Sequence, residues 1–188
     1  MKKFFEKYGK ILILFLLGLT AFYGLRHLKK TDQVNGLVEF NDKRDRAFIK
    51  SIFNTEDDYY WLVNYPYFDV DFMLDHKVPS KDKMQYEGKL NVRTFLVDGK
   101  PAGFLTYYPK SFKTAWIQFL AVAKEYRGKG YSKDILTSVF QELKNKGFTT
   151  VQLLTRINNK PAISLYKSIG FEVTEEDPYG IIYFSRNL

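Results

Sequence analysis

The sequence predicts a mixed α/β domain preceded by an apolar N-terminal helix. Three observations favour this class: β-rich and helix-like runs alternate along residues 34–188, an Asp-Gly pair joins two of the β-rich runs, and a glycine-rich turn separates a strand-like run from an amphipathic one. The 188 residues are enough for one ordinary domain, and a composition of 45% apolar and 27% charged residues is typical of a globular protein.

The first part of the domain carries weaker signals than the rest. A short strand is predicted near residues 36–40, and the spacing of apolar residues predicts an amphipathic helix over 42–53. Residues 55–90 mix aromatic and acidic side chains and contain two prolines. This composition allows a second helix there and argues against any long element.

The later residues alternate more clearly between the two kinds of element. Six strands are predicted, over residues 91–97, 102–109, 114–123, 149–154, 171–173 and 180–185. The first two are joined around Asp98-Gly99, a strong hairpin signal. Apolar residues from 135 to 143 mark a helix that ends at Gly147, and a shorter helix is predicted over 158–170. The predicted order is therefore β-α-α-β-β-β-α-β-α-β-β.

Charge and composition exclude several classes of function. Residues 1–30 hold seven Lys or Arg and one acidic residue, so +6 of the formal net charge of +8 belongs to the N-terminus and only +2 to the rest. A nearly neutral domain gives little reason to expect nucleic acid as a partner. The chain has no cysteine and two histidines, which excludes a disulfide framework and a cysteine nucleophile and argues against a metal site.

The N-terminal segment, residues 1–30, predicts a membrane anchor. Residues 11–25 are uncharged and mostly apolar, and basic residues stand on both sides of them. As a helix this stretch would span roughly 22 Å, short of the ~30 Å hydrocarbon core, but Lys10 and Arg26 could snorkel and close the gap. A signal peptide is one alternative, although no convincing cleavage site follows, and a buried core helix is another.

The stretch "KEYRGKGYSKDIL", residues 124–136, combines a strand end, two glycines and a helix start. The first backbone N–H groups of a helix have no partner within it, and the helix dipole adds a partial positive charge there. Gly128 and Gly130 would let a phosphate approach the backbone closely, and Arg127 and Lys129 add positive charge. The stretch therefore predicts a phosphate or pyrophosphate site, with a solvated turn as the alternative. It matches neither a Walker A loop nor a dinucleotide fingerprint.

In this context the stretch resembles the acetyl-CoA-binding segment of the GNAT superfamily of N-acetyltransferases, whose pattern is Arg/Gln-x-x-Gly-x-Gly/Ala. Arg127, Gly130 and Ser132 occupy its fixed places, with serine where the family has Gly or Ala. Downstream, "NNKPAISLYKSIGFE" is similar to a second signature of that family, Asn-x-x-Ala-x-x-Leu-Tyr-x-x-x-Gly-Phe. The matching residues are Asn159, Ala162, Leu165, Tyr166, Gly170 and Phe171. The resemblance covers roughly residues 34–188.

The resemblance implies a GNAT-like fold, with a mixed central sheet flanked by helices, and the transfer of acetyl from acetyl-CoA to a primary amine by direct attack. By that likeness, the backbone of Leu120, Ala121 and Val122 would pair with the pantetheine arm, and a backbone N–H near Val122 would stabilise the tetrahedral intermediate. The pyrophosphate would bind a turn made of Arg127, Gly128, Lys129, Gly130, Tyr131 and Ser132. Asn159 would contact CoA near its pantetheine arm, and Tyr166 would protonate the leaving thiolate.

Two of these residues also have a purely structural explanation. Asn159 stands two residues before Pro161, where a helix N-cap is expected. Tyr166 shares a helix face with Ala162 and Leu165, so packing alone could explain an aromatic residue there.

The acceptor side has no fixed motif. The segment 58–73 lies where the family builds its acceptor wall, and its aromatics could receive a cationic amine together with nearby acids. These acids are Asp57, Asp58, Asp69 and Asp71. The attacking amine must lose a proton. Candidates for that step are Glu87, Asp75 and His76, a water held by Gln118, or a relay of waters.

The expected cellular location of the domain follows from the acetyl donor, acetyl-CoA. Acetyl-CoA is chiefly an intracellular metabolite, so we expect a single-pass membrane protein with its catalytic domain on the cytosolic side, although the charges flanking residues 11–25 are nearly balanced. Two alternative functions stay open. One is a catalytically silent acyl-CoA-binding or scaffold domain, and the other is an acyltransferase that uses a different donor.

Overall fold

The structure, a computed structural model, describes residues 35–63, 68–75 and 90–188, which belong to one compact unit, Asn35–Leu188. The predicted N-terminal helix, with its span at residues 11–25, lies outside the described residues, as do His76 and Glu87. Among the helices that are described, none is long and apolar enough to cross a membrane.

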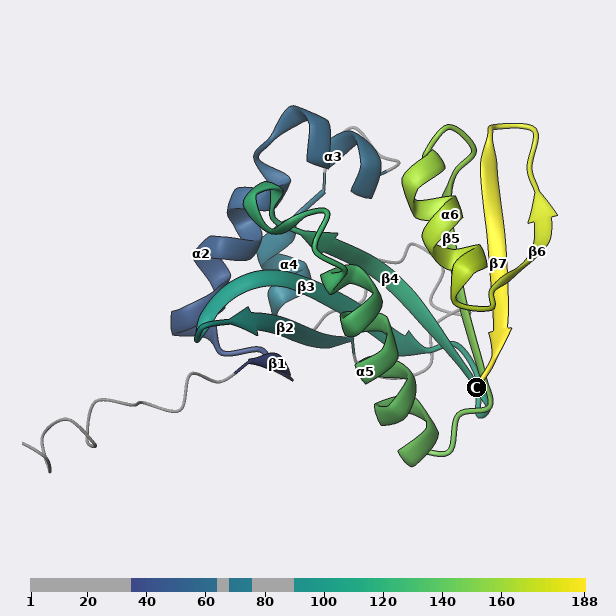
Figure 1. Cartoon of the computed structure of the whole chain (residues 1–188), viewed down its shortest axis with the longest axis horizontal. Helices are drawn as coiled ribbons and strands as arrows, with labels where there is room; N and C mark the ends of the chain where they lie inside the picture. Colours follow the sequence, from purple (N-terminus) through teal and green to yellow (C-terminus); the bar gives the residue numbers. More distant parts are fainter. Residues whose placement is uncertain (1–34, 64–67, 76–89) are drawn as a thin grey trace, which may run out of the picture. The chain divides into compact units, whose positions relative to one another are not determined.

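Seven strands of the described chain form one mixed sheet in the order β1-β2-β3-β4-β5-β7-β6 (Figure 1). They are β1 (Gly36–Glu39), β2 (Asn91–Val97), β3 (Lys100–Pro109), β4 (Thr114–Val122), β5 (Thr150–Arg156), β6 (Glu172–Glu176) and β7 (Ile181–Asn187). Neighbouring strands are antiparallel except β4 and β5, which are parallel. The central sheet of mixed direction predicted from the sequence is confirmed.

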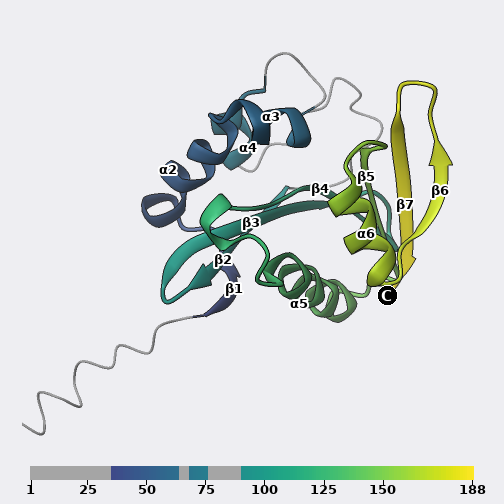
Figure 2. The ribbon, with the colours of Figure 1, turned by 45° about the horizontal axis from the view of Figure 1, so that its top comes forward.

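Helices cover both faces of the sheet. As the turned view in Figure 2 shows, one face carries α2 (Asp42–Phe53), α3 (Glu56–Leu62) and α4 (Val70–Leu74), and the other carries α5 (Tyr131–Asn145) and α6 (Lys160–Ser168). A 3₁₀ turn, η1 (Lys124–Tyr126), stands between β4 and α5. The predicted alternation of elements is confirmed, and the described part of residues 55–90 contains two short helices where the sequence allowed one.

Local sequence signals fix several element ends as predicted. Asp98 and Gly99 have φ values of 52° and 72°, the pair of positive φ angles that the tight hairpin between β2 and β3 requires. The side chain of Asn159 accepts a hydrogen bond from the Ala162 N–H at 3.3 Å, so Asn159 is the N-cap of α6. Helix α5 ends just before Gly147, whose φ is 85°.

Each face of the sheet has its own buried core. The predicted apolar stripe of α5 is buried against one face, with Ile135, Leu136 and Leu143 fully inaccessible to solvent. On the opposite face, α2 buries Ile49 and Phe53. Burying large apolar side chains stabilises a fold by roughly 1.5–3 kcal/mol each, so the stripe holds α5 firmly against the sheet.

Strands β4 and β5 pair over only part of their length. The register joins residues 114–116 to residues 150–152, but β4 continues to Val122 and β5 to Arg156 without further pairs between them. Strand β3 still pairs with β4 as far as Val122, so only the edge of β4 that faces β5 is left open. Figure 1 shows the two strands diverging toward the glycine-rich turn that follows β4.

The end of β4 is held against β3 at a position that has room only for glycine. A Cβ atom added to Gly103 would lie 2.8 Å from the backbone oxygen of Ala121 and 3.0 Å from Cδ1 of Ile135. A clash with a backbone atom cannot be relieved by a change of rotamer. We therefore expect Gly103→Ala to destabilise the fold by about 1–3 kcal/mol, the usual cost of overpacking. Urea denaturation would measure the loss, and an unchanged midpoint would contradict this close approach of β3 to β4.

Candidate active site

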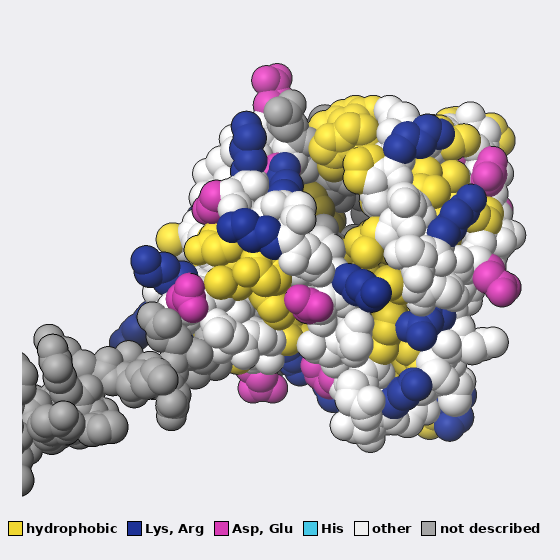
Figure 3. Space-filling model, in the orientation of Figure 1, with side chains coloured by type: hydrophobic (Ala, Val, Ile, Leu, Met, Phe, Trp, Pro, Cys, Tyr) yellow, Lys and Arg dark blue, Asp and Glu magenta, His cyan; other side chains and the backbone are white. Residues whose placement is uncertain are grey.

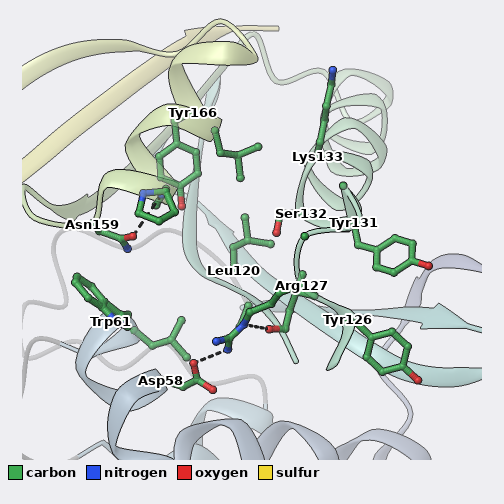
Figure 4. A pocket seen from close by; sticks show the side chains of 18 of the residues that line it. Asp58, Trp61, Leu120, Tyr126, Arg127, Tyr131, Ser132, Lys133, Asn159 and Tyr166 are labelled. Atoms are coloured by element: carbon green, nitrogen blue, oxygen red, sulfur yellow. Dashed lines mark hydrogen bonds and ion pairs between the residues drawn. The ribbon is translucent and has the colours of Figure 1, made fainter. Parts of the chain in front are cut away.

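A cavity of about 640 Å³ lies where β4 and β5 diverge. Its lining comes from α3, the end of β4, the glycine-rich turn, the start of α5, and α6 with its preceding loop (Figure 4). Most of the residues that the sequence assigned to the site line this cavity: Leu120, Ala121, Val122, Arg127, Gly128, Gly130, Tyr131, Ser132, Asn159 and Tyr166. The fold thus brings together two motifs that are separate in the sequence.

The glycine-rich turn, residues 127–132, presents a run of free backbone donors to the cavity. No hydrogen bond within the described part of the chain uses the N–H groups of residues 128–132. Gly128 and Gly130 have φ values of 75° and 86°, and a Cβ atom at either position would meet nothing within 4 Å. Gly130 is the N-cap of α5 and offers no capping side chain. The turn therefore has the geometry of an anion-binding nest at a helix N-terminus.

The two cations of the turn are placed differently from one another. The Arg127 Nε donates to the carbonyl of Val122 at 2.8 Å, and its guanidinium forms a salt bridge with Asp58 of α3. Lys129 does not line the cavity, and its ammonium group lies over the ring of Tyr126, 5.5 Å from the centroid. Of the two, only Arg127 therefore lines the cavity, where its guanidinium is already paired with Asp58.

Asn159 lines the cavity, but its side chain already has two partners. Its oxygen caps α6 through Ala162, and its Nδ2 donates to Thr155 Oγ1 at 3.1 Å. A primary amide has a second N–H. The capping role that the sequence suggested is therefore compatible with a further contact to a ligand.

Tyr166 is buried, with a relative exposure of 8%, and its ring packs edge-on against Phe171 and Phe184. Figure 4 shows its hydroxyl pointing into the cavity, toward the open edge of β4 near Leu120. No hydrogen bond within the described residues engages this hydroxyl. Burial raises the pKa of Tyr166 to about 12. The phenol therefore stays protonated at neutral pH and can donate a hydrogen bond or a proton to a group in the cavity.

The acids near the predicted acceptor wall have separate functions in the structure. Asp69 caps α4 through the Phe72 N–H, and Asp71 bridges Arg46 and Lys50 of α2. Asp75 pairs with the same Arg46 at 3.0 Å. These contacts tie α4 to α2, which explains the three acids without any acceptor. Asp58 alone among the acids with described side chains lines the cavity, whereas Gln118 does not.

Helix α3 contributes lining residues that have no motif of their own. Trp61 and Leu62 face the cavity from α3, and Lys133 and Asn158 complete it from α5 and from the loop before α6. The aromatic run of residues 58–73 was the only signal in the sequence for this wall. Tertiary contacts fix the position of α3, because the guanidinium of Arg156 donates hydrogen bonds to the backbone oxygens of Tyr60 and Val63.

Comparison with known proteins points to the same chemistry. A profile of the Acetyltransferase (GNAT) family matches residues 49–171, well over half of the chain. N-acetyltransferase 8 of Rattus norvegicus is 34% identical over 68 residues, which cover 36% of this chain and 31% of that protein. N-alpha-acetyltransferase 30 of Schizosaccharomyces pombe is 36% identical over 56 residues, 30% of this chain and 37% of that protein. The matched stretch spans about a third of the length of these relatives.

The fold has counterparts among solved structures. The PaiA N-acetyltransferase of Thermoplasma acidophilum, solved in complex with coenzyme A, superposes with a TM-score of 0.64. The superposition covers 82% of this chain and 99% of that chain, at 16% sequence identity. Identity this low shows a common fold and leaves the substrate to be argued from the cavity itself.

Proposed function

The chain belongs to the acetyltransferase (GNAT) family, and on that basis we propose that it transfers an acetyl group from acetyl-CoA to a primary amine. One observation carries the proposal. A single cavity combines free backbone donors at the glycine-rich turn, the open edge of β4 and the buried hydroxyl of Tyr166. These features match, in order, a pyrophosphate, an extended amide-bearing arm and a departing thiolate.

The residues of the cavity have distinct parts in the proposed reaction. The N–H groups of residues 128–132 would hold the pyrophosphate, and the open edge of β4 from Leu120 to Val122 would pair with the pantetheine amides. The thioester supplies an electrophilic carbonyl carbon. The amine nitrogen bonds to that carbon, the C–S bond breaks, the amine releases one proton to water, and the thiolate takes one proton from Tyr166. Water then returns a proton to the phenolate.

Turnover by the purified full-length chain would test the function. With acetyl-CoA as donor, the panel of acceptors should contain a lysine-bearing peptide, a peptide with a free N-terminus and a polyamine. We expect release of CoA thiol with at least one acceptor, accompanied by a mass increase of one acetyl group in that acceptor. Binding of CoA without product on any amine would support the silent binding domain instead. If product forms only with an acyl donor other than acetyl-CoA, the chain is instead an acyltransferase that uses that donor.

We also propose that residues 1–30 anchor the protein in a membrane, with the catalytic domain in the cytosol. The proposal is supported by the uncharged apolar stretch at 11–25, by the basic residues on both sides of it and by the intracellular location of acetyl-CoA. The full-length chain should sediment with membranes after salt washing, and a chain that starts at Asp32 should not. Digestion of the domain by protease added to intact cells would contradict the cytosolic orientation.

A further inference from the structure

Helix α3 presents an acid and an aromatic ring to the cavity, one helical turn apart. Asp58 and Trp61 both line the cavity, and residues three positions apart lie on the same face of a helix. The indole of Trp61 is 41% exposed, and Figure 3 shows apolar side chains beside the hollow where α3 faces α6. A carboxylate beside an indole can bind an ammonium group, through opposite charge and through the face of the ring.

The ring of Trp61 is available to such a group. The neighbouring ring of Tyr60 is covered by the guanidinium of Arg156, which lies 4.4 Å from its centroid. Trp61 packs at 76° to Tyr60, and no cation of the described residues lies over its indole. A cation from outside the chain can therefore stack on Trp61.

The carboxylate of Asp58, in contrast, has a partner in the structure. It is paired with the guanidinium of Arg127, and the Nε of the same side chain donates to the carbonyl of Val122 at 2.8 Å (Figure 4). Arg127 thus reaches from the glycine-rich turn, past the end of β4, to α3. One side chain therefore connects the part of the cavity proposed for the acetyl donor with the part that carries Asp58.

Arg127 lies on the edge of β4 that the pantetheine arm would use. In an antiparallel pair, successive residues direct their backbone groups alternately toward the partner strand and away from it. The N–H of Ala123 donates to Ala102 of β3, so the backbone groups of Leu120 and Val122 point away from β3, to the open edge. The side chain of Arg127 therefore holds the carbonyl with which an amide of the arm would pair, and the arm has to displace it.

A displaced Arg127 has a new partner close by. A pyrophosphate on the turn carries more negative charge than one carboxylate, and a guanidinium binds phosphate oxygens in pairs. Helix α3 does not depend on Arg127 for its position, because Arg156 donates hydrogen bonds to the backbone oxygens of Tyr60 and Val63. Loss of the Arg127 contact therefore leaves the carboxylate of Asp58 in the cavity with its charge unpaired.

We propose that Asp58 and Trp61 bind the ammonium form of the acceptor amine, and that Arg127 closes this site until the acetyl donor binds. Donor binding moves Arg127 from Asp58 to the pyrophosphate, and the carboxylate then receives the acceptor. The proposal rests on the proposed function, because it takes acetyl-CoA as the molecule on the turn and on β4. The bound amine loses its proton to water before it attacks the thioester. The acetylated product is neutral at that nitrogen, so its attraction to Asp58 is lost and Arg127 can pair with Asp58 again.

Calorimetric titration of the full-length protein with CoA would test the closing role of Arg127. Asp58→Asn weakens the pair, so this variant should bind CoA about three- to tenfold more tightly than the wild type. The gain is modest because the side chain of Arg127 is 45% exposed. Glu56→Gln is the matched control, since Glu56 is an exposed acid of the same helix outside the cavity lining. Equal or weaker CoA binding by Asp58→Asn would show that the pair merely supports the turn, and would contradict the proposal.

Kinetics with the acceptor that is acetylated in the panel would test the ammonium site. Loss of a hydrogen bond to a charged group should raise its KM about tenfold or more in Asp58→Asn. The kcat at saturating acceptor should stay within about twofold of the wild type, because binding in the ground state is what is lost. The acetylated form of the same acceptor should bind the variant and the wild type equally well.

A third measurement would test the link between the two substrates. With CoA, which has no acetyl group to transfer, the wild type should bind the acceptor about three- to tenfold more tightly than without CoA, by the reciprocity of linked binding. In Arg127→Gln this ratio should fall toward one, because Asp58 is then accessible in both cases. Glutamine is the alternative that the family pattern has at this position, so the turn should be retained.

Two results would overturn the proposal and leave the proposed function intact. An unchanged KM for the acceptor in a folded Asp58→Asn protein would remove the ammonium site. Equal affinity of the wild type for the acceptor with and without CoA would remove its control by Arg127. Failure of the wild type to bind CoA, or to acetylate any amine of the panel, would instead remove the proposed function and the ammonium site with it.

Discussion

Replacing Tyr166 with phenylalanine is expected to lower kcat for acetyl transfer by roughly 10²-fold and to leave CoA affinity nearly unchanged. General acid catalysis is worth ~10²–10⁴-fold, and a thiolate needs less help to leave than an alkoxide, so the lower end applies. The ring contacts with Phe171 and Phe184 survive the change. The hydroxyl has no hydrogen-bond partner within the described residues, so stability should change by less than about 1 kcal/mol.

A second buried tyrosine supplies the matched control. Tyr107, 1% exposed, donates its hydroxyl hydrogen to Glu142 and accepts a hydrogen bond from Lys146, and it does not line the cavity. Tyr107→Phe should therefore lower the free energy of unfolding by about 1–3 kcal/mol, because hydrogen bonds to charged groups are lost. Its kcat should stay close to that of the wild type. The two variants should thus show opposite effects on catalysis and on stability.

The leaving group separates proton donation from mere positioning of the thioester. If Tyr166 acts as an acid, the loss in kcat should shrink when the donor carries a more acidic thiol, because a weaker base needs a proton less. Since burial raises the pKa of Tyr166 to about 12, its acid form is present throughout the neutral range, and its own titration should reduce kcat only at strongly alkaline pH. Equal kcat values for Tyr166→Phe and wild type on the true acceptor would remove Tyr166 from the mechanism.

Gly130→Val is expected to weaken CoA binding by about 10²-fold or more, because a side chain would occupy the position proposed for the pyrophosphate and would block at least two charge-assisted hydrogen bonds. The space beside Gly130 is open in the protein itself, with no atom within 4 Å of an added Cβ. The substitution should also lower the stability of the protein. Since φ is 86° there, an L-residue is also strained, by roughly 1–2 kcal/mol.

Gly147→Val separates the two effects of that substitution. Gly147 follows the opposite end of α5, has a φ of 85°, and likewise has no atom within 4 Å of an added Cβ. The two variants should therefore lose similar stability in thermal denaturation, and only Gly130→Val should lose CoA affinity in calorimetry. If both variants, correctly folded, bind CoA as the wild type does, the phosphate assignment of the turn is wrong.

The sequence by itself determined the features that depend on neighbouring residues. The Asp98-Gly99 hairpin, the Asn159 cap and the apolar stripe of α5 are local, because each follows from backbone freedom, one side-chain hydrogen bond or a helical period within a few residues. The same locality made the glycine-rich turn recognisable. Its free N–H groups follow directly from a helix that begins after a glycine with no capping side chain.

Only the tertiary structure decided what these parts face. The cavity exists because β4 and β5 stop pairing after a few residues, and that depends on segments far apart in the sequence. The pairing of Arg127 with Asp58 joins residues 69 positions apart. No spacing rule could have shown that Asp58 lines the cavity whereas Asp71 pairs with Arg46 of α2. Long-range contacts of this kind are set by the packing of whole elements, which local propensity does not encode.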